Sequence, residues 1–402
     1  MRKLISKALT MVLIVGILTF VSFANADDVQ VHKYGLIKQK LHDYFQQLYI
    51  EKIFSGTVIV AQQGHILLED GFGMADYDTG EKNKPKTAYC IGSMSKAFTA
   101  MSIMILEEKG LLSIYDTIDQ FIPNYPNGNI ITIHQLLNHT SGIFELINDP
   151  TSSLWDNGFE GLALYYTPDQ LLMYFMNRPL YFEPGTQWSY CNSGFIVLGI
   201  IIENVSGMTY ADFIKKNILQ PLGMKDTFYD PYNLDCPAKA VGYDDVLSDP
   251  PPVSPLLHPS LAYSAGGIFS TVKDIYKWDQ ALYTNRLVSY QTLNKIFTPE
   301  LGNYGYGWWI DGIEIAGQSY KQIWHWGSYI GYHSLISRLV DEKITLILLQ
   351  NISAPNDAFD DQEIIRNDVY NIVFNPYPDI DTSAVEKLKQ QRNFSQGPRK
   401  MN

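Results

Sequence analysis

Two pairs of short apolar runs, one pair near each end of the chain, constrain the fold more than any other feature of the sequence. Residues 57–61 (TVIVA) and 65–69 (HILLE) flank the short connection Gln62-Gln63-Gly64, which predicts a β-hairpin. Residues 332–339 and 344–350 flank a polar turn and predict a second hairpin. Two hairpins so far apart predict an α+β fold, in which one antiparallel sheet is completed by strands from both ends of the chain.

Helical patterns fill the sequence around and between these hairpins. Apolar residues recur at helical spacing over residues 32–50, and a closing helix is predicted over 358–374. The segment of roughly 111–265 is rich in Pro, Asn and Tyr, so we expect a mainly helical, loop-rich subdomain there. A single large domain over 27–379 accounts for this organisation, and the weakly apolar residues 380–402 are expected to form a flexible tail.

The first 26 residues have the pattern of a secretory signal peptide. A basic start with Arg2, Lys3 and Lys7 precedes an apolar run over 8–23, and Ala24-Asn25-Ala26 supplies a small-x-small cleavage signature. An uncleaved membrane anchor is the alternative, but the apolar run is shorter than the roughly 20 residues that a spanning helix needs. We therefore expect cleavage after Ala26, a secreted or periplasmic protein, and no stable membrane span after cleavage.

Composition narrows the class of function. A formal net charge of -12 argues against a nucleic-acid partner, and the scattered histidines do not suggest zinc, so neither a metal nor a cofactor is expected. No Gly-x-Ser-x-Gly elbow is present, which argues against an ordinary α/β-hydrolase. Three cysteines cannot all pair within one chain. Cys90 and Cys191 are interpreted as small buried hydrophobic residues, with a disulfide between them as the alternative.

Ser93 and Lys96 form the candidate catalytic pair. The run Ile91-Gly92-Ser93-Met94-Ser95-Lys96 leads into a helical pattern over 97–109, so Ser93 opens a helix and lies one turn away from Lys96. A hydroxyl needs an adjacent base to act as a nucleophile, and a neutral lysine can be that base. An apolar setting and the positive helix N-terminus both disfavour the ammonium form of the lysine.

A second Ser-x-x-Lys shows that this spacing alone is a weak signal. Ser270 and Lys273 have the same separation as the candidate pair. There, however, Thr271 predicts a helix N-cap with Asp274 at the third helical position, so we favour Ser93 as the nucleophile.

Two further motifs carry groups suited to acyl transfer. In Tyr190-Cys191-Asn192, an extended backbone would point the phenol and the amide to one side, where the phenol can relay a proton and the amide can hold a substrate carbonyl. In His325-Trp326-Gly327-Ser328, an edge strand with a cation and then a glycine would face an anionic substrate group and offer an N–H to an oxyanion. Taken alone, His325 is better explained as a partly buried histidine with satisfied hydrogen bonds.

The three motifs together are more specific than any one of them. Ser93-x-x-Lys96, Tyr190-x-Asn192 and His325-x-Gly327, in this order, resemble the active-site triplet of the penicillin-recognising serine hydrolases, specifically the class C β-lactamase and D-Ala-D-Ala carboxypeptidase group. Further matching segments are residues 133–142 (IHQLLNHTSG), 266–271 (GGIFST) with Asp274, and 304–308 (YGYGW). The resemblance implies a β-lactamase/transpeptidase-like fold, a central antiparallel sheet flanked by helices with a mainly helical subdomain.

The resemblance also implies roles for the candidate residues. Ser93 would be acylated, Lys96 would be its base and Tyr190 the proton relay. The backbone N–H groups of Ser93 and Ser328 would form the oxyanion hole. The residues expected to bind substrate are Asn192, His325, Gly327 and Ser328.

One departure from the lactamase pattern changes the expected substrate. The lactamases usually carry Lys-Thr-Gly as the third motif, whereas this chain has His325-Trp326-Gly327. The chain is therefore expected to be a D-Ala-D-Ala carboxypeptidase-like peptidase that works through an acyl-enzyme at Ser93. An esterase or class C-like β-lactamase is the alternative, and a penicillin-binding sensor without turnover is the alternative of another class. Its partner would be a small peptide, such as a cell-wall peptide, a β-lactam or an ester.

Overall fold

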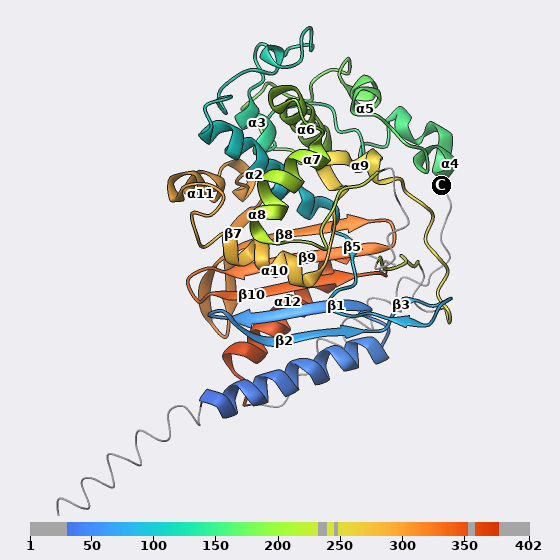
Figure 1. Cartoon of the computed structure of the whole chain (residues 1–402), viewed down its shortest axis with the longest axis vertical. Coiled ribbons are helices and arrows are strands. Elements are labelled where there is room, and N and C mark those ends of the chain that lie inside the picture. The colour runs from blue at the N-terminus through green and yellow to red at the C-terminus, as the bar shows by residue number, and fades with distance from the viewer. Residues whose placement is uncertain (1–29, 232–238, 245–247, 353–357, 378–402) are drawn as a thin grey trace, which may run out of the picture.

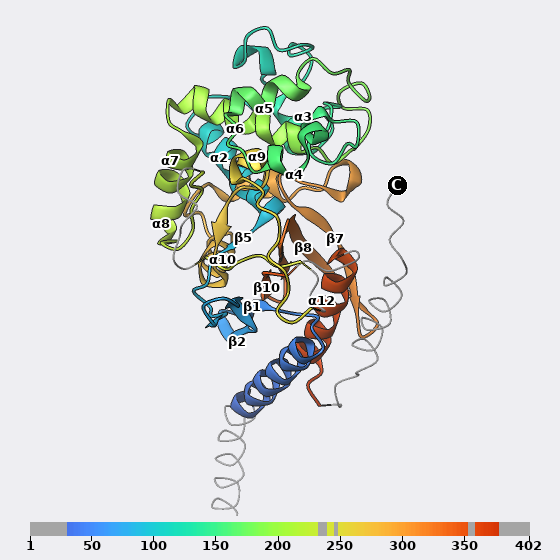
Figure 2. The same cartoon turned by 90° about the vertical axis from the view of Figure 1, so that its right-hand side faces the viewer.

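The computed structural model describes residues 30–231, 239–244, 248–352 and 358–377. Both the expected signal peptide and the expected tail over 380–402 lie outside these residues. A central sheet has a thick helical layer at one end of the molecule and the helix over residues 30–50 at the opposite end (Figures 1 and 2). This is the α+β, β-lactamase/transpeptidase-like fold that the sequence predicts.

The central sheet is antiparallel, with the order β2-β1-β10-β9-β8-β7, so strands from the two ends of the chain meet at the β1–β10 pair. Both predicted hairpins are confirmed as β1–β2 and β9–β10. The strand β7, with Asp311 and Gly312 at its centre, was not predicted from the sequence. The six strands are β1 Gly56–Gln62, β2 His65–Phe72, β7 Trp309–Ile315, β8 Gln318–Tyr329, β9 Tyr332–Leu339 and β10 Ile344–Gln350.

Alternation along β1 shows how the sheet divides two cores. Val58 and Val60 point into a cluster with the helix over 30–50 and with α12 Ala358–Phe374. Ile59 and Ala61 point to the opposite face, into the larger cluster that contains α2 and α10. Because successive side chains of a strand face opposite sides, a continuous apolar run such as TVIVA belongs to a strand covered on both faces.

The helical layer lies beyond the β8 side of the sheet, away from β2 (Figure 1). Helices α2 and α6 lie inside it, and nearly every side chain of α2 from Ser95 to Leu106 is buried. A helix buried on all sides carries no amphipathic stripe. The helices of this part of the molecule are α2 Ser95–Glu108, α3 Ile133–Leu137, α4 Gly158–Leu162, α5 Pro168–Phe175, α6 Asn192–Ser206, α7 Tyr210–Ile214, α8 Gln220–Leu222, α9 Pro259–Gly266 and α11 Tyr290–Ile296. The helix α10 Val272–Ala281 lies across the face of the sheet, against β1 and β10 (Figure 1).

Helices α6 and α9 pack closely because Gly199 lies at their contact. A Cβ atom at this position would lie 2.2 Å from the Ser264 Oγ and 2.5 Å from the Tyr263 Cε1.

Among the described residues, no single helix is long and apolar enough to cross a membrane. The two helices over 192–206 and 210–222, which are bent against each other, meet the criteria of length and composition only when they are taken together.

Cys90 and Cys191 are both free thiols and both buried. Their interpretation as small buried residues is confirmed, and the disulfide alternative is wrong. Burial raises the pKa of the Cys90 thiol to about 12, so the neutral thiol is the form present at neutral pH.

Candidate active site

Ser93 lies in a tight turn between the sheet and α2. The 3-10 turn Gly92–Met94 follows the short strand β5 Tyr89–Cys90 and runs directly into α2, as the sequence predicts for a serine that opens a helix. Gly92 has φ +50, and a Cβ on it would lie 2.8 Å from the Ser328 carbonyl oxygen and 2.9 Å from the Ser328 nitrogen. Only glycine allows this approach, which brings the Ser93 turn against the backbone of β8.

The Lys96 amine contacts three oxygen atoms from three parts of the chain. Its Nζ lies 3.0 Å from the Ser93 Oγ, 2.7 Å from the Asn192 Oδ1 and 2.9 Å from the Ala265 carbonyl oxygen. The Asn192 Oδ1 and the Ala265 carbonyl oxygen can only accept hydrogen bonds. A neutral amine that donates its two hydrogens to them has its lone pair left for the Ser93 hydroxyl proton.

The environment of Lys96 favours this neutral form. Its side chain is 0% exposed, and burial lowers the pKa of Lys96 to about 7, although Glu145 and Cys191 oppose the shift. The Tyr190 and Phe195 rings lie 4.7 Å and 5.5 Å from its Nζ. Desolvation is therefore the main reason that a lysine here can act as a base near neutral pH.

A backbone distortion in α9 directs the Ala265 carbonyl oxygen toward the Lys96 amine. Tyr263 has φ 41 and ψ -126, a conformation that non-glycine residues rarely adopt. The carbonyls of the next two residues then face α2: the Ser264 oxygen accepts the Thr99 hydroxyl at 2.7 Å, and the Ala265 oxygen accepts from Lys96. Nothing in the matching segment 266–271 predicts the contact between Lys96 and the Ala265 carbonyl.

Tyr190 and Asn192 both face Lys96, as the sequence predicts. Asn192 is the first residue of α6, and Cys191 before it has an extended backbone and points away to the Ile143 carbonyl. Burial raises the pKa of Tyr190, and a hydrogen bond with the Ser93 side chain opposes that shift only in part. Tyr190 is therefore a neutral phenol beside the Ser93 hydroxyl across the physiological pH range.

Glu145 is a site residue that the sequence analysis missed. Its side chain is 7% exposed, and its Oε1 accepts the Asn192 Nδ2 at 2.6 Å, while its Oε2 accepts the Asn192 backbone N–H at 2.5 Å. Glu145 follows directly on the matching segment 133–142, but an isolated glutamate in a loop carries no spacing that singles it out.

His139 was quoted only as part of that segment, yet it supports the Tyr190 ring. The two ring centroids lie 4.4 Å apart, and the His139 Nδ1 accepts the Cys191 backbone N–H at 3.1 Å. The rings of Phe195, Tyr304 and Trp188 also lie beside it. Burial lowers the pKa of His139 well below its usual value, so this imidazole is neutral and acts as a support for the phenol.

His325 lies close to this group, on an edge of the sheet as expected, but it differs from the expected cation. β7 pairs with β8 over Gln318–Trp324, whereas the part of β8 from His325 to Tyr329 pairs with β9. Burial lowers the pKa of His325 to about 3, and its side chain is 1% exposed. Its Nδ1–H donates to the Trp326 carbonyl at 2.5 Å and its Nε2 accepts the Tyr304 hydroxyl at 2.9 Å. His325 is a neutral histidine with both nitrogens satisfied, so the prediction of a cation is wrong.

Gly327 allows β8 to pack against the chain segment before Ser93. A Cβ on Gly327 would lie 2.1 Å from the Ile91 carbonyl oxygen and 2.5 Å from the Ser334 Oγ. The absence of a side chain at Gly327 therefore allows a close approach of the protein's own backbone. Ser328, the next residue of β8, is exposed and borders the Ser93 turn.

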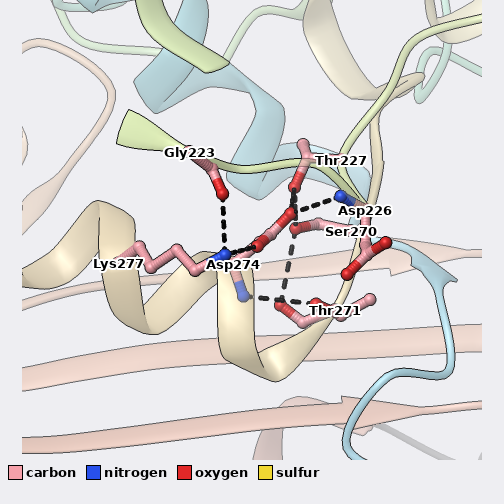
Figure 3. A network of polar contacts seen from close by, with 7 residues as sticks. All are labelled: Gly223, Asp226, Thr227, Ser270, Thr271, Asp274 and Lys277. Atoms are coloured by element: carbon pink, nitrogen blue, oxygen red, sulfur yellow. Dashed lines mark hydrogen bonds and ion pairs between the residues drawn. The ribbon is translucent and has the colours of Figure 1, made fainter. Parts of the chain in front are cut away.

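Ser270 and Lys273, the second Ser-x-x-Lys, form no such site. Ser270 is fully buried and its hydroxyl pairs with the Thr227 hydroxyl at 2.8 Å, while the Lys273 Nζ lies 2.7 Å from the Glu69 carboxylate. The Thr271 N-cap of α10 is confirmed. Figure 3 shows that Asp274 holds this region together, accepting hydrogen bonds from the Asp226 N–H, the Thr227 hydroxyl and the Lys277 amine.

An accessible hydroxyl hydrogen-bonded to a desolvated lysine, between an antiparallel sheet and a helical layer, defines a serine hydrolase with a Ser-Lys pair. Within the described ranges, no group of three or more His, Cys, Asp or Glu side chains is arranged to hold a metal ion.

Comparison with known proteins gives the family. The β-lactamase family model matches residues 41–370. The chain is 32% identical to penicillin-binding protein 4* of Bacillus subtilis over 375 residues, which cover 88% of this chain and 80% of that protein. The crystal structure of a penicillin-binding protein from Bacillus halodurans has a TM-score of 0.70 at 27% identity, covering 81% of this chain and 99% of that one.

A D-stereospecific amidohydrolase from Streptomyces sp. is also similar, with a TM-score of 0.65 at 26% identity over 79% of this chain and 94% of that one. The chain belongs to the β-lactamase family, whose members here include penicillin-binding proteins, and it is a serine hydrolase.

Proposed function

We propose that the chain is an exported, penicillin-binding-protein-like peptidase that transfers acyl groups through Ser93, with a D-Ala-D-Ala carboxypeptidase activity on cell-wall peptide as its specific reaction. The observation that carries this proposal is the arrangement around Lys96, where two carbonyl oxygens take the amine hydrogens and the lone pair faces Ser93. The names of the relatives, penicillin-binding protein and D-stereospecific amidohydrolase, support a small amide substrate with a D-amino acid.

In the first step, the Ser93 oxygen attacks the substrate carbonyl while its proton passes to the Lys96 nitrogen. The backbone N–H groups of Ser93 and Ser328 stabilise the oxyanion, a role supported by the contact between Gly92 and the Ser328 backbone. The bond to the leaving amine breaks, and that amine takes its proton from the Tyr190 phenol, which Lys96 reprotonates.

In the second step, water replaces the leaving amine. The Lys96–Tyr190 pair accepts a proton from the water, whose oxygen attacks the acyl carbonyl. The ester bond to the Ser93 Oγ then breaks, and this oxygen takes the proton back from the Lys96–Tyr190 pair. Asn192 supports both steps through Lys96, since its Oδ1 holds the amine. One Nδ2 hydrogen is used by Glu145, so only the other is available to a substrate carbonyl.

A second candidate, an amidase or esterase that acts on uncharged substrates, is favoured by His325. The expected cation for the substrate carboxylate is a neutral histidine that already pairs with Tyr304 and Trp326. A substrate whose leaving group carries a carboxylate gains no ion pair from it. An amide or ester of a D-amino acid needs no ion pair with His325 in order to bind.

One experiment separates these candidates. The protein without residues 1–26 and its Ser93→Ala variant are incubated with a D-Ala-D-Ala peptide, the same peptide as its C-terminal amide, its L-Ala-L-Ala isomer, a nitrophenyl ester and a chromogenic cephalosporin. Intact mass and released product are recorded for each.

Preferential cleavage of the D-Ala-D-Ala peptide supports the carboxypeptidase, whereas faster cleavage of the amide or ester supports the second candidate. Turnover of the cephalosporin indicates a β-lactamase, and a lasting adduct without product indicates a sensor. An adduct that persists in Ser93→Ala overturns the assignment of the nucleophile. Export is tested separately, by the N-terminal sequence of the protein recovered outside the producing cells, which is expected to begin at Asp27.

A further inference from the structure

The side chain of Glu145 accepts four hydrogen bonds from N–H groups. Its Oε1 accepts the Asn192 Nδ2 at 2.6 Å and the backbone N–H groups of Ile147 and Asn148, both at 3.1 Å. Its Oε2 accepts the Asn192 backbone N–H at 2.5 Å. Three of these N–H donors bond to Oε1 and one bonds to Oε2, so each of the four donors requires an acceptor at this position.

This pattern decides which way the Asn192 amide faces. A carboxylate rejects the Asn192 oxygen and accepts its nitrogen, so the amide is fixed with Nδ2 on Glu145 and Oδ1 on Lys96. A flipped amide would present N–H to the Lys96 nitrogen, which would have to turn its lone pair toward Asn192 and away from Ser93. The orientation of one amide therefore decides whether Lys96 can take the Ser93 proton.

We propose that Glu145 is a positioning residue of the catalytic site: acting through Asn192, it fixes the amide orientation that directs the Lys96 lone pair at Ser93. The inference rests on the proposed role of Ser93 and Lys96 and adds a residue that touches neither of them.

A purely structural role is the competing explanation. Cys191, the N-cap of α6, makes no side-chain cap, and Glu145 satisfies the N–H of the first helical residue. A negative group at a helix N-terminus stabilises the helix whatever it does for catalysis. The two explanations differ in what they predict for the plateau rate, because only the positioning role changes the orientation of the Lys96 lone pair, and it does so through Asn192.

The test compares Glu145→Gln with the wild type by the initial rate of p-nitrophenyl acetate hydrolysis from pH 5 to 9, with the Ser93→Ala rate subtracted. A glutamine places an NH2 group among the four donors and accommodates the flipped amide. We expect the plateau rate to fall by about tenfold or more. The loss of the negative charge, which now raises the pKa of Lys96, should also move the acid limb down by about one pH unit.

Two further variants keep the test independent of folding. Glu145→Asp keeps the charge and is expected to keep the acid limb where the wild type has it. Asp274→Asn alters another buried carboxylate with its own hydrogen-bond network outside the site (Figure 3), and is expected to lower the melting temperature without moving the limb.

A double-mutant cycle with Asn192→Ala tests whether Glu145 acts through Asn192. On the Asn192→Ala background, Glu145→Gln is expected to lower the plateau rate by less than twofold. An unchanged plateau rate in Glu145→Gln, or a tenfold loss that persists on the Asn192→Ala background, overturns the inference. Equal rates for the wild type and Ser93→Ala overturn the proposed function instead, so the two failures are distinguishable.

Discussion

The Nζ of Lys96 lies 3.0 Å from the Oγ of Ser93, inside a site where the lysine side chain is completely buried. The sequence places these two residues one helical turn apart, but any Ser-x-x-Lys on a helix shares that separation. The acceptors Asn192 Oδ1 and Ala265 O, from two other parts of the chain, leave only one direction for the lone pair of a neutral amine. The pair is thus a hydroxyl and a base rather than two neighbouring polar groups.

The rate of Ser93 acylation is predicted to follow the ionisation of Lys96. Only the neutral amine accepts a proton, and burial lowers the pKa of Lys96 to about 7. Below pH 7 the rate should fall about tenfold per pH unit, and above it the rate should level off. Stopped-flow measurement with p-nitrophenyl acetate checks the profile. Lys96→Met should lose about 100-fold or more in rate, and a variant that keeps the full rate would exclude Lys96 as the base.

The buried His325 is predicted to make the fold sensitive to acid. Its pKa is lowered to about 3, below the value of about 6.5 for an exposed histidine in the unfolded chain. The unfolded state therefore binds the proton first, and the free energy of unfolding falls as pH drops from about 6.5 toward 3. His325→Gln can still accept from Tyr304 and donate to Trp326, and it should reduce this slope. Urea unfolding at pH 7, 6 and 5 measures it, and equal slopes for both proteins would contradict the prediction.

The close packing of α6 on α9 is predicted to depend on Gly199. Gly199→Ala would place a methyl group 2.2 Å from the Ser264 Oγ, so the free energy of unfolding should fall by about 1–3 kcal/mol. The acylation rate should fall as well, because Ala265 on α9 holds the Lys96 amine. Gly194→Ala on the same helix is the matched control: its nearest neighbour would be 3.6 Å away, and we expect no loss of stability in thermal unfolding. A Gly199→Ala protein as stable as Gly194→Ala would refute this explanation.

The second Ser-x-x-Lys is predicted to be dispensable for chemistry. Ser270→Ala and Lys273→Ala should form the same acyl adduct as the wild type by intact mass, since Ser270 is fully buried and Lys273 pairs with Glu69. Ser270→Ala removes a hydrogen bond to Thr227 and should lower the free energy of unfolding by about 1 kcal/mol. Loss of the adduct in either variant would show that this motif takes part in the reaction.

Local patterns in the sequence were enough to predict much of the fold. The continuous apolar runs of β1 and β10 identify strands covered on both faces, and the turn residues beside them identify hairpins with β2 and β9. The strand β7 could not be found in this way, because Asp311 and Gly312 interrupt its apolar pattern and only the pairing with β8 makes it a strand.

The candidate site, like the fold, was predicted from the sequence only in part. Ser93, Lys96, Tyr190 and Asn192 were found because their residue types and order form a pattern, and the structure brings these side chains together. The charge of His325 was misjudged, because a residue letter does not report burial, and burial removes the proton from this imidazole.

The sequence by itself determined the order of the strands along the chain, the helix that begins at the nucleophile, and the chemical groups available for acyl transfer, since these depend on neighbouring residues. Only the tertiary structure decided which groups can act. Desolvation of Lys96, the orientation of the Asn192 amide by Glu145 and the direction of the Ala265 carbonyl all arise where segments far apart in the chain meet. Protonation states and hydrogen-bond directions depend on those surroundings, and no local pattern contains them.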